Sequence, residues 1–307
     1  MFFFGLSALR RLAYRRSWLA STRLSVPVVV VGNIVAGGAG KTPLTLWLAQ
    51  ALRAAGRRPG IVSRGYGRTG TEIRKVDVQD TVSAVGDEPL LLARRSGCPV
   101  YVGADRAAAA QVLLGAHPDC DLILCDDGLQ HYRLQRDVEI AVLDRRGLLN
   151  GWPQPAGPLR EPAGRLRVVD AVVLNDAAAH AVTGVPNYAM RLDGATFHRL
   201  DTSDTCSAVE LDGLCLHAVA GIGEPQRFFD HLIALGLRCV VHSFPDHHAY
   251  AAEDLDFTGD AILMTEKDAL KCAGLTTLPI WVLPVVAHVD PDLVRLVLEK
   301  IDGCALA

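Results

Sequence analysis

The chain has 307 residues, half of them apolar, and a formal net charge of −3 at pH 7. This length predicts one large or two medium domains with a sizeable core, and the near-neutral charge argues against a general nucleic-acid binder. Eight cysteines occur without a C-x-x-C pair, so the sequence lacks zinc-site spacing, and we expect reduced, mostly buried thiols in the cytoplasm.

The first 23 residues differ from the rest of the chain in charge, because they contain five arginines and no acidic residue. The leading apolar run, residues 1–9, is too short to span a bilayer, and its arginines follow it, whereas a signal peptide carries its charges first. Leucines and aromatic residues mixed with arginines predict a basic amphipathic helix over residues 1–23 in the interface of an anionic membrane. The alternative is an ordinary helix packed on the domain, with its arginines in solvent.

The most specific motif follows this segment. Four β-branched residues, Val28–Val31, predict a buried strand, Gly37–Gly40 form a glycine-rich turn, and Lys41 and Thr42 open an apolar helix. Backbone N–H groups of such a turn hold phosphate oxygens, while the lysine reaches the β- and γ-phosphates and the threonine hydroxyl binds Mg²⁺. Val35 stands where the strict motif has glycine, so the turn is the G-G-x-G-K-T variant of a P-loop.

Strand-like and helix-like segments alternate after the P-loop. Strands are predicted at residues 26–33, 58–63, 100–103, 121–125, 138–143 and 171–174, and helices at 42–55 and 105–115. Continuous apolar strands alternating with helices predict a parallel sheet covered on both faces. We therefore expect a P-loop NTPase-like α/β domain over residues 24–186. Within it, the proline- and glycine-rich stretch 148–167 is expected to be a long functional loop.

Residues 188–192 and 196–200 alternate apolar and polar side chains around Asp193-Gly194, which predicts a β-hairpin. We assign residues 187–200 to this hairpin and expect it to link two domains. Strands at 214–220, 239–243, 261–265 and 280–284 and helices at 225–235 and 291–301 follow it. They predict a second, smaller α/β domain over residues 201–307 that closes over the active site.

Polar side chains stand where several predicted strands end. Asp126 and Asp127 follow the strand at 121–125, and in a P-loop fold a neighbouring strand delivers carboxylates to Mg²⁺. Such carboxylates can also simply start a turn. Arg106 and Arg160 occupy loops near strand ends and suit phosphates, with solvated surface arginines as the alternative. His131 fits the same site or a plain loop equally well.

An acid and a histidine from different domains form a further candidate pair. Asp87 lies in Gly86-Asp87-Glu88-Pro89 at a predicted helix start, and His247 lies in Asp246-His247-His248 after a strand. The acid could be only a cap and the histidine only structural. Together they can supply a base for an acceptor hydroxyl in the cleft between the domains. The segment Thr265–Asp268 ends another strand of the second domain, and it either helps to bind nucleotide or caps the next helix.

These motifs, in this order, resemble the tetraacyldisaccharide 4′-kinase (lipid A 4′-kinase) family. The matching segments run from Gly32 to Ala269 and are GNIVAGGAGKTP, SRGYGR, GDEP, DDGLQH, GPLREP, GIGEP, FPDHHAY and TEKDA. The resemblance implies ATP-dependent phosphorylation of the 4′-hydroxyl of a tetraacyldisaccharide 1-phosphate, which gives lipid IVA in lipid A and lipopolysaccharide biosynthesis. It also implies a peripheral enzyme on the cytoplasmic face of the bacterial inner membrane. Its partners would be the acylated glucosamine disaccharide 1-phosphate and the anionic membrane surface, with no nucleic acid and no obligate protein partner.

The resemblance also implies roles for individual residues. The ATP-binding P-loop comprises Val35, Ala36, Gly37, Gly38, Ala39, Gly40, Lys41 and Thr42, and Arg106 and Arg160 add contacts to the nucleotide. Mg²⁺ or phosphate contacts come from Asp126, Asp127 and Glu161 together with Thr42. Catalysis is given to Lys41 and to the Asp87–His247 pair, which activates the acceptor hydroxyl. His247 rather than His248 matches the Asp-His step of the family.

A competing class is a P-loop ATPase or GTPase that acts as a switch or metallochaperone, because such proteins share the G-G-x-G-K-T turn. The sequence contains no N-K-x-D-like guanine motif and no cluster of cysteines or histidines for metal cargo. A third class, a non-enzymatic membrane-bound binding module, is opposed by the P-loop with its paired acids. Nucleotide hydrolysis that depends on an acylated sugar acceptor would separate a kinase from both.

Overall fold

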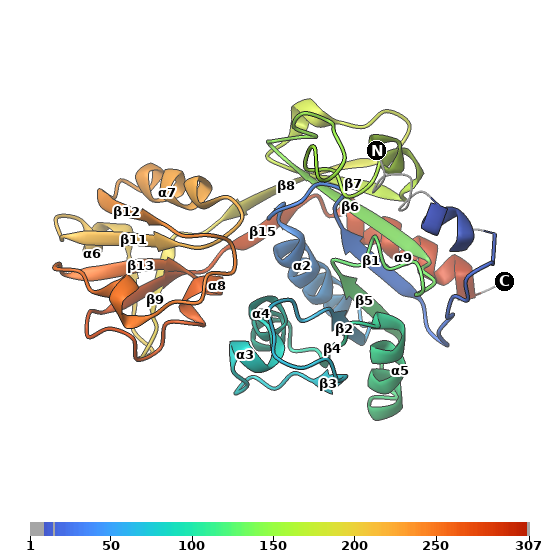
Figure 1. The fold of residues 1–307 in the computed structure, drawn as a ribbon, viewed down its shortest axis with the longest axis horizontal. Coiled ribbons are helices and arrows are strands. Elements are labelled where there is room, and N and C mark those ends of the chain that lie inside the picture. The colour runs from blue at the N-terminus through green and yellow to red at the C-terminus, as the bar shows by residue number, and fades with distance from the viewer. Residues whose placement is uncertain (1–8, 15, 306–307) are drawn as a thin grey trace.

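The structure is a computed structural model, and it describes residues 9–14 and 16–305. Two lobes, each built on its own β-sheet, lie side by side, with the strands β8 (Asn187–Asp193) and β15 (Val286–Val289) leading from one to the other (Figure 1). The predicted α/β class with two unequal lobes is confirmed.

The larger lobe contains a nine-stranded sheet in the order β15-β8-β7-β6-β1-β5-β2-β4-β3. Its other strands are β1 (Val28–Gly32), β2 (Pro59–Ser63), β3 (Arg74–Lys75), β4 (Val100–Val102), β5 (Leu122–Asp126), β6 (Val138–Asp144) and β7 (Ala171–Asn175). The pairings from β8 to β4 are parallel, and β15 and β3 join the two edges antiparallel. The helices are α2 (Lys41–Ala54), α3 (Val82–Val85), α4 (Asp87–Ser96), α5 (Arg106–Ala116) and α9 (Asp292–Ala305), with 3₁₀ turns η1 (Ala163–Val168) and η2 (Ala178–His180).

Apolar layers cover both faces of this sheet. Val29 and Val31 of the central strand β1 belong to the core shared with α2, α4 and α9. Val28 and Val30 point the other way, into the core shared with α5 and η1. Because every residue of β1 is buried, the strand reads as a continuous apolar run rather than an alternating one. The P-loop follows β1 and is therefore held at the centre of the sheet, between the ends of β5 and β6.

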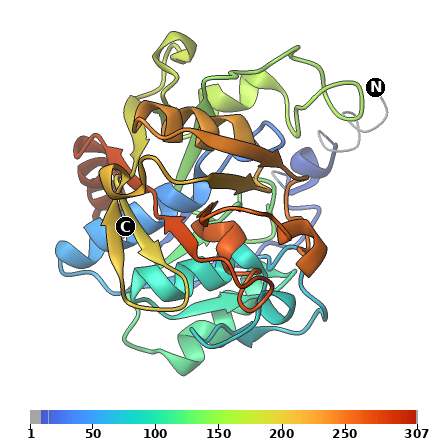
Figure 2. The same ribbon diagram turned by 90° about the vertical axis from the view of Figure 1, so that its left-hand side faces the viewer.

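The smaller lobe is a six-stranded sheet in the order β10-β9-β14-β13-β11-β12. Its strands are β9 (Thr196–Arg199), β10 (Thr205–Ser207), β11 (Leu216–Ala220), β12 (Cys239–Ser243), β13 (Ala261–Thr265) and β14 (Ile280–Leu283), and its helical segments are α6 (Ala208–Leu211), α7 (Pro225–Ala234), α8 (Glu266–Ala269) and η3 (Ala252–Leu255). Helix α7 packs its phenylalanines on one face, and η3 packs Leu255 on the other. Figure 2 shows this lobe in front of the larger one.

The predicted β-hairpin over residues 187–200 is wrong. Strand β8 pairs with β7 and β15 in the larger sheet, whereas β9 pairs with β10 and β14 in the smaller one. Alternation shows that a strand has one buried face, but it does not show which strand it pairs with. The break at Asp193-Gly194 carries the chain between the sheets. A Cβ on Gly194 would lie 2.3 Å from the carbonyl oxygen of Pro284 on the returning segment, so the two crossings touch there.

The predicted second domain over residues 201–307 is wrong at its C-terminal end. Strand β15 and helix α9 return to the larger lobe, where Ala287, Leu293 and Ile301 are buried in the same core as α2. The sequence pattern identified the helix at 291–301 but not the sheet that it covers. Two segments of chain therefore join the lobes, and the smaller lobe is an insertion between β8 and β15.

The N-terminal segment lies against the larger lobe. Residues 9–14 are helical, and the ring of Tyr14 lies 6.2 Å from the ring of Tyr132. Leu9 is 56% exposed and Trp18 is 68% exposed. Residues 1–8 and 15 of the predicted interfacial helix lie outside the described residues. Within the described ranges, no helix is both long and apolar enough to cross a membrane.

Candidate active site

Left-handed glycines and side-chain hydrogen bonds shape the P-loop. Gly37 and Gly40 have φ angles of 102° and 95°, which only glycine adopts at low cost. The carbonyl oxygen of Gly37 accepts from Asn33 Nδ2 at 3.3 Å and from Lys41 Nζ at 3.4 Å. The carbonyl oxygen of Ala39 accepts from Asn175 Nδ2, on the end of β7, at 3.0 Å. These bonds hold the turn in place before a nucleotide binds.

The paired acids at the end of β5 have different surroundings. Asp126 is fully buried beside α2, where one carboxylate oxygen accepts from Thr45 Oγ1 at 2.9 Å and the other, Oδ2, has no hydrogen-bond partner. Burial, together with the nearby carboxylates of Glu88 and Asp127, raises the pKa of Asp126 to about 7. A buried carboxylate with an unpartnered oxygen is a site that a cation would satisfy. The predicted metal role of Asp126 therefore fits its surroundings.

Asp127, unlike Asp126, has cationic side chains next to both of its carboxylate oxygens. It has a φ angle of 49°, and both of its oxygens accept from Arg160 at 3.0 Å. Lys41 Nζ lies 3.9 Å away. Burial alone would raise the pKa of Asp127, but Lys41 and Arg160 together lower it below its ordinary value. Asp127 is thus ionised and pairs with two cations that line the cavity.

The remaining predicted phosphate and metal contacts gather around the same cavity. Arg106 donates from Nη2 to the carbonyl oxygen of Asp127 at 3.3 Å. The carboxylate of Glu161 is buried and accepts from Tyr132 and, at 3.2 Å, from Gln130 Nε2. Because these neighbours already occupy its oxygens, Glu161 is bound into the cavity wall in this structure. Its direct contact with Mg²⁺ remains a prediction, and no group of three or more acid, cysteine or histidine side chains suited to a metal is found among the described residues.

A cavity of about 540 Å³ brings the predicted site together. Its walls carry Arg10, Gly37, Gly38, Lys41, Ser63, Arg64, Tyr66, Glu88, Arg106, Asp127, Gln130, Tyr132, Gln154, Arg160, Glu161, Asp246, His247 and Lys267. Both lobes and the N-terminal helix contribute to it. Asp126 lies behind this wall, and His131 turns away, with Nε2 3.5 Å from Asp105 Oδ1.

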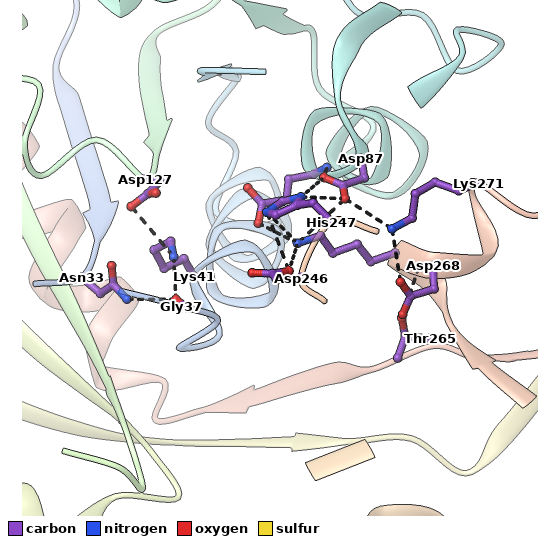
Figure 3. Close-up of polar contacts among 12 residues, drawn as sticks. Asn33, Gly37, Lys41, Asp87, Asp127, Asp246, His247, Thr265, Asp268 and Lys271 are labelled. Atoms are coloured by element: carbon purple, nitrogen blue, oxygen red, sulfur yellow. Dashed lines mark hydrogen bonds and ion pairs between the residues drawn. The ribbon is translucent and has the colours of Figure 1, made fainter. Parts of the chain in front are cut away.

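The pair predicted from two separate lobes is formed. His247 Nδ1 lies 2.9 Å from Asp87 Oδ2 and 3.2 Å from Asp87 Oδ1 (Figure 3). Asp87 opens α4 in the larger lobe, and His247 follows β12 in the smaller one with a φ angle of 62°. His248 points elsewhere, because its Nε2 lies 2.9 Å from Asp254 Oδ2. The geometry thus selects His247 over its neighbour.

The surroundings of the pair fix its charge state. Burial would raise the pKa of Asp87, but the hydrogen bond from His247 and the ammonium groups of Lys267 and Lys271 lower it below its ordinary value. The hydrogen bond to Asp87 in turn raises the pKa of His247, although burial and Lys267 oppose this. Since an ionised carboxylate only accepts, His247 donates its Nδ1–H to Asp87, which leaves the Nε2 lone pair as the basic one.

The sequence analysis left several contacts around this pair unresolved or unnoticed. Lys267, in the segment whose role stayed open, lies 3.3 Å from His247 Nε2, 3.3 Å from Asp246 Oδ1 and 3.4 Å from Glu88 Oε1. The ring of Tyr66 lies 4.8 Å from the His247 ring. The motifs SRGYGR and TEKDA carried the only sequence signal for these two residues.

The smaller lobe also covers the P-loop directly. A Cβ on Gly223 would lie 2.5 Å from the backbone nitrogen of Gly38, so no other residue fits between the lobes here without a shift. The next residue, Glu224, accepts from Arg145 Nε at 2.9 Å. Arg227 of α7 donates to Asn175 Oδ1 at 2.7 Å, and Asn175 also holds the P-loop. The second lobe therefore rests on the phosphate-binding turn.

Comparisons with known proteins agree with this site. The sequence model of the family described as tetraacyldisaccharide-1-P 4′-kinase matches residues 1–302. The tetraacyldisaccharide 4′-kinase of Dechloromonas aromatica is 55% identical over 99% of this chain and 91% of its own length, and that of Aromatoleum aromaticum is 51% identical over 97% and 90%. The chain belongs to the tetraacyldisaccharide 4′-kinase family.

A solved structure shows the same fold. The "apo" form LpxK of Aquifex aeolicus in complex with ATP superposes with a TM-score of 0.82 at 29% identity, covering 98% of this chain and 96% of that one. The resemblance that the motifs predicted is thus confirmed, and so are the kinase class and ATP as the nucleotide. A switch or metallochaperone is not favoured. The family acts on a disaccharide precursor of lipid A.

Proposed function

We propose that this kinase transfers the γ-phosphoryl group of ATP to the 4′-hydroxyl of a membrane-held tetraacyldisaccharide 1-phosphate in the cavity between its lobes. The observation that carries the proposal is the Asp87–His247 pair, which joins the two lobes and whose histidine lines the same cavity as Lys41 of the P-loop. A switch protein has no need of such a base, whereas transfer to a sugar hydroxyl does.

On the nucleotide side, the residues act by charge and position. The P-loop N–H groups and the N-terminus of α2 receive the β- and γ-phosphates, and Lys41 neutralises the oxygens of the transferred group. Arg160, aligned by Asp127, adds a second cation, and Arg106 a third. Mg²⁺, when bound, would neutralise further phosphate charge, and the residues that would hold it are Thr42, Asp126 and Asp127, with Glu161 in the wall beside them.

On the acceptor side, the pair handles the proton. The 4′-oxygen forms a bond to the γ-phosphorus while the bond to the β,γ-bridging oxygen breaks, and ADP leaves with that electron pair. The hydroxyl proton moves to Nε2 of His247. Asp87 holds the ring through Nδ1 and stabilises the imidazolium that forms, so the two residues work as a unit.

The N-terminal segment suits a substrate that stays in the membrane. We infer that its exposed apolar side chains, Leu9, Leu12 and Trp18, enter the lipid interface on the cytoplasmic face of the inner membrane, with the arginines near anionic headgroups. Arg10 lines the cavity, so an interfacial helix here would bring the site to the bilayer surface. No protein partner is needed in this arrangement.

The decisive experiment is a transfer assay. Purified enzyme is incubated with γ-labelled ATP, Mg²⁺ and the tetraacyldisaccharide 1-phosphate in mixed micelles, and the position of the new phosphate is read by mass spectrometry. We expect label at the 4′-oxygen, and none when the 4′-hydroxyl is replaced by hydrogen. Hydrolysis that is indifferent to the acceptor, with no labelled lipid, would contradict the proposal.

A further inference from the structure

Lys267 occupies the one position that the acceptor hydroxyl needs. The Nδ1–H of His247 is committed to Asp87, so only Nε2 can take the hydroxyl proton. Yet Lys267 Nζ lies 3.3 Å from that same Nε2. An ammonium group has three hydrogens and no lone pair, so it can only donate to the imidazole. The ammonium group of Lys267 therefore covers the basic lone pair of His247 in this structure.

Three carboxylates hold the ammonium at this point. Lys267 Nζ lies 3.3 Å from Asp246 Oδ1, 3.4 Å from Glu88 Oε1 and 3.9 Å from Asp87 Oδ2. Burial alone would lower the pKa of Lys267, but these three carboxylates raise it above its ordinary value. The side chain is 16% exposed, and it stays charged throughout the working pH range. It is thus a cation, unable to act as a base itself.

The other groups facing His247 do not cover Nε2. Tyr66 packs on the ring from SRGYGR, with centroids 4.8 Å apart, and Asp246 Oδ1 lies 3.8 Å from Nε2 without donating. Lys271 is on the far side of Asp87, at 3.9 Å from Oδ2, and is bound to Asp268 at 3.2 Å (Figure 3). Of these neighbours, Lys267 alone is placed to donate to the lone pair.

We propose that Lys267 is a positioning residue that covers the His247 base until the acceptor sugar displaces it, and so restrains transfer of the γ-phosphoryl group to water. The inference rests on the proposed function, because it assumes that Nε2 takes the acceptor proton. A water molecule at Nε2 would be activated just as a sugar hydroxyl is, and the cavity is large enough to hold water. Covering the lone pair suppresses this reaction without altering the P-loop.

The test compares two reactions of one enzyme. Acceptor-independent ATP hydrolysis and 4′-phosphoryl transfer are measured for the wild type, Lys267→Met and the matched control Lys271→Met. The control removes an equal charge beside Asp87 but leaves the contact with Nε2. We expect the rate of acceptor-independent hydrolysis itself to rise about tenfold or more in Lys267→Met, and the ratio of hydrolysis to transfer to rise with it, since an uncovered general base is worth about 10²–10⁴ in rate. The ratio for Lys271→Met should stay at the wild-type value, whatever its absolute rates.

Three results discriminate the possibilities. If folded Lys267→Met keeps the wild-type ratio of hydrolysis to transfer, the covering role is overturned. The kinase proposal still stands in that case, provided that the wild type catalyses transfer. Loss of transfer with no gain in hydrolysis would overturn it as well, by making Lys267 a phosphate contact. Restoration of the low ratio by Lys267→Arg supports it. If the methionine variant does not fold in a thermal melt, Lys267→Ala takes its place, because it leaves the same lone pair uncovered with less apolar bulk.

Discussion

The P-loop and the Asp87–His247 pair lie at one cavity, which Lys41 and His247 both line, but they are built in opposite ways. The P-loop consists of consecutive residues that follow the central strand of one sheet, and hydrogen bonds within the larger lobe hold its shape. The pair joins residues 160 positions apart, one on each lobe. In the proposed function, the larger lobe alone therefore holds the phosphate-binding turn, whereas the proposed acceptor base forms only where the two lobes meet. Such a division lets ATP bind before the reaction is enabled.

The sharpest test of this comparison is to remove the two-lobe pair. Asp87→Ala and His247→Ala should each lower kcat by about 10²–10⁴, the range for a positioned proton acceptor, while ATP affinity stays nearly unchanged. Because the two side chains act as a unit, the double variant should be little worse than the poorer single one. Steady-state kinetics and nucleotide binding measure both. His248→Ala, which loses only a contact with Asp254, is the matched control. Fully multiplicative losses would instead indicate independent roles.

Removing Lys41, the cation of the P-loop, tests the proposed phosphate site of the larger lobe. Lys41→Ala should lower kcat by about 10²–10³, the usual cost of one preorganised electrostatic contact, with little change in melting temperature. Unlike the pair variants, it should depress acceptor-independent hydrolysis and transfer equally, because both reactions use the same phosphate site. Near-wild-type turnover by a folded Lys41→Ala protein would rule out the P-loop role.

Substitutions of Asp126 and Asp127 should have different kinetic effects, because the two carboxylates have different surroundings. Asp126→Ala removes the carboxylate with the unpartnered oxygen, and Asp127→Ala removes the one that aligns Arg160. We expect the first to raise the Mg²⁺ concentration needed for half-maximal rate, and the second mainly to raise the KM for ATP, each lowering kcat as well. Thr45→Val controls for the hydrogen bond to Asp126 alone. If both acid variants keep the normal Mg²⁺ dependence, the metal is bound elsewhere.

A smaller effect is expected in the pH dependence of kcat/KM, where two variants should shift the acidic limb in opposite directions. The pair is active when His247 is neutral, so kcat/KM should rise as pH rises through the pKa of His247. The hydrogen bond to Asp87 raises that pKa, and Lys267 lowers it. Asp87→Asn should therefore move the acidic limb to lower pH, and Lys267→Met should move it to higher pH. Limbs that move in the same direction, or not at all, would show that another group titrates.

The sequence predicted the local part of this site well, and of the contacts between the lobes it predicted the Asp87–His247 pair but not the contacts of Lys267 and Tyr66 with that pair. The P-loop, the strands β1, β2, β4, β5, β6 and β7 of the larger sheet and the acids after β5 follow from apolar periodicity and from residues adjacent in the chain. Asp87 and His247 were a candidate pair from their residue types alone, but no spacing relates two residues on separate lobes, so the choice between a base and a cap with a structural histidine came only from the family resemblance. The same limit explains the wrong hairpin: alternation shows a buried face, whereas the partners of β8 and β9 are set by tertiary packing. Lys267 stayed ambiguous because its role depends on three carboxylates from two lobes.

The smallest expected effect is on membrane binding by the N-terminal segment, which lies against the larger lobe. Deleting residues 1–19 should weaken binding to anionic liposomes, and raised salt should weaken the intact protein in the same way, because screening removes the attraction of the arginines. Turnover of a short-chain, water-soluble acceptor should survive the deletion, since the P-loop and the base pair lie outside the deleted segment, which among its described residues contributes only Arg10 to the cavity wall. A finer variant is Leu12→Asp with Trp18→Asp, which places charge on exposed apolar positions of the segment. Its control is Val209→Asp with Ile233→Asp on the smaller lobe, where two exposed apolar residues receive the same two charges. Sedimentation with liposomes should separate the two. Equal binding by both variants, and by the deletion, would favour a helix that only packs on the domain beside Tyr132.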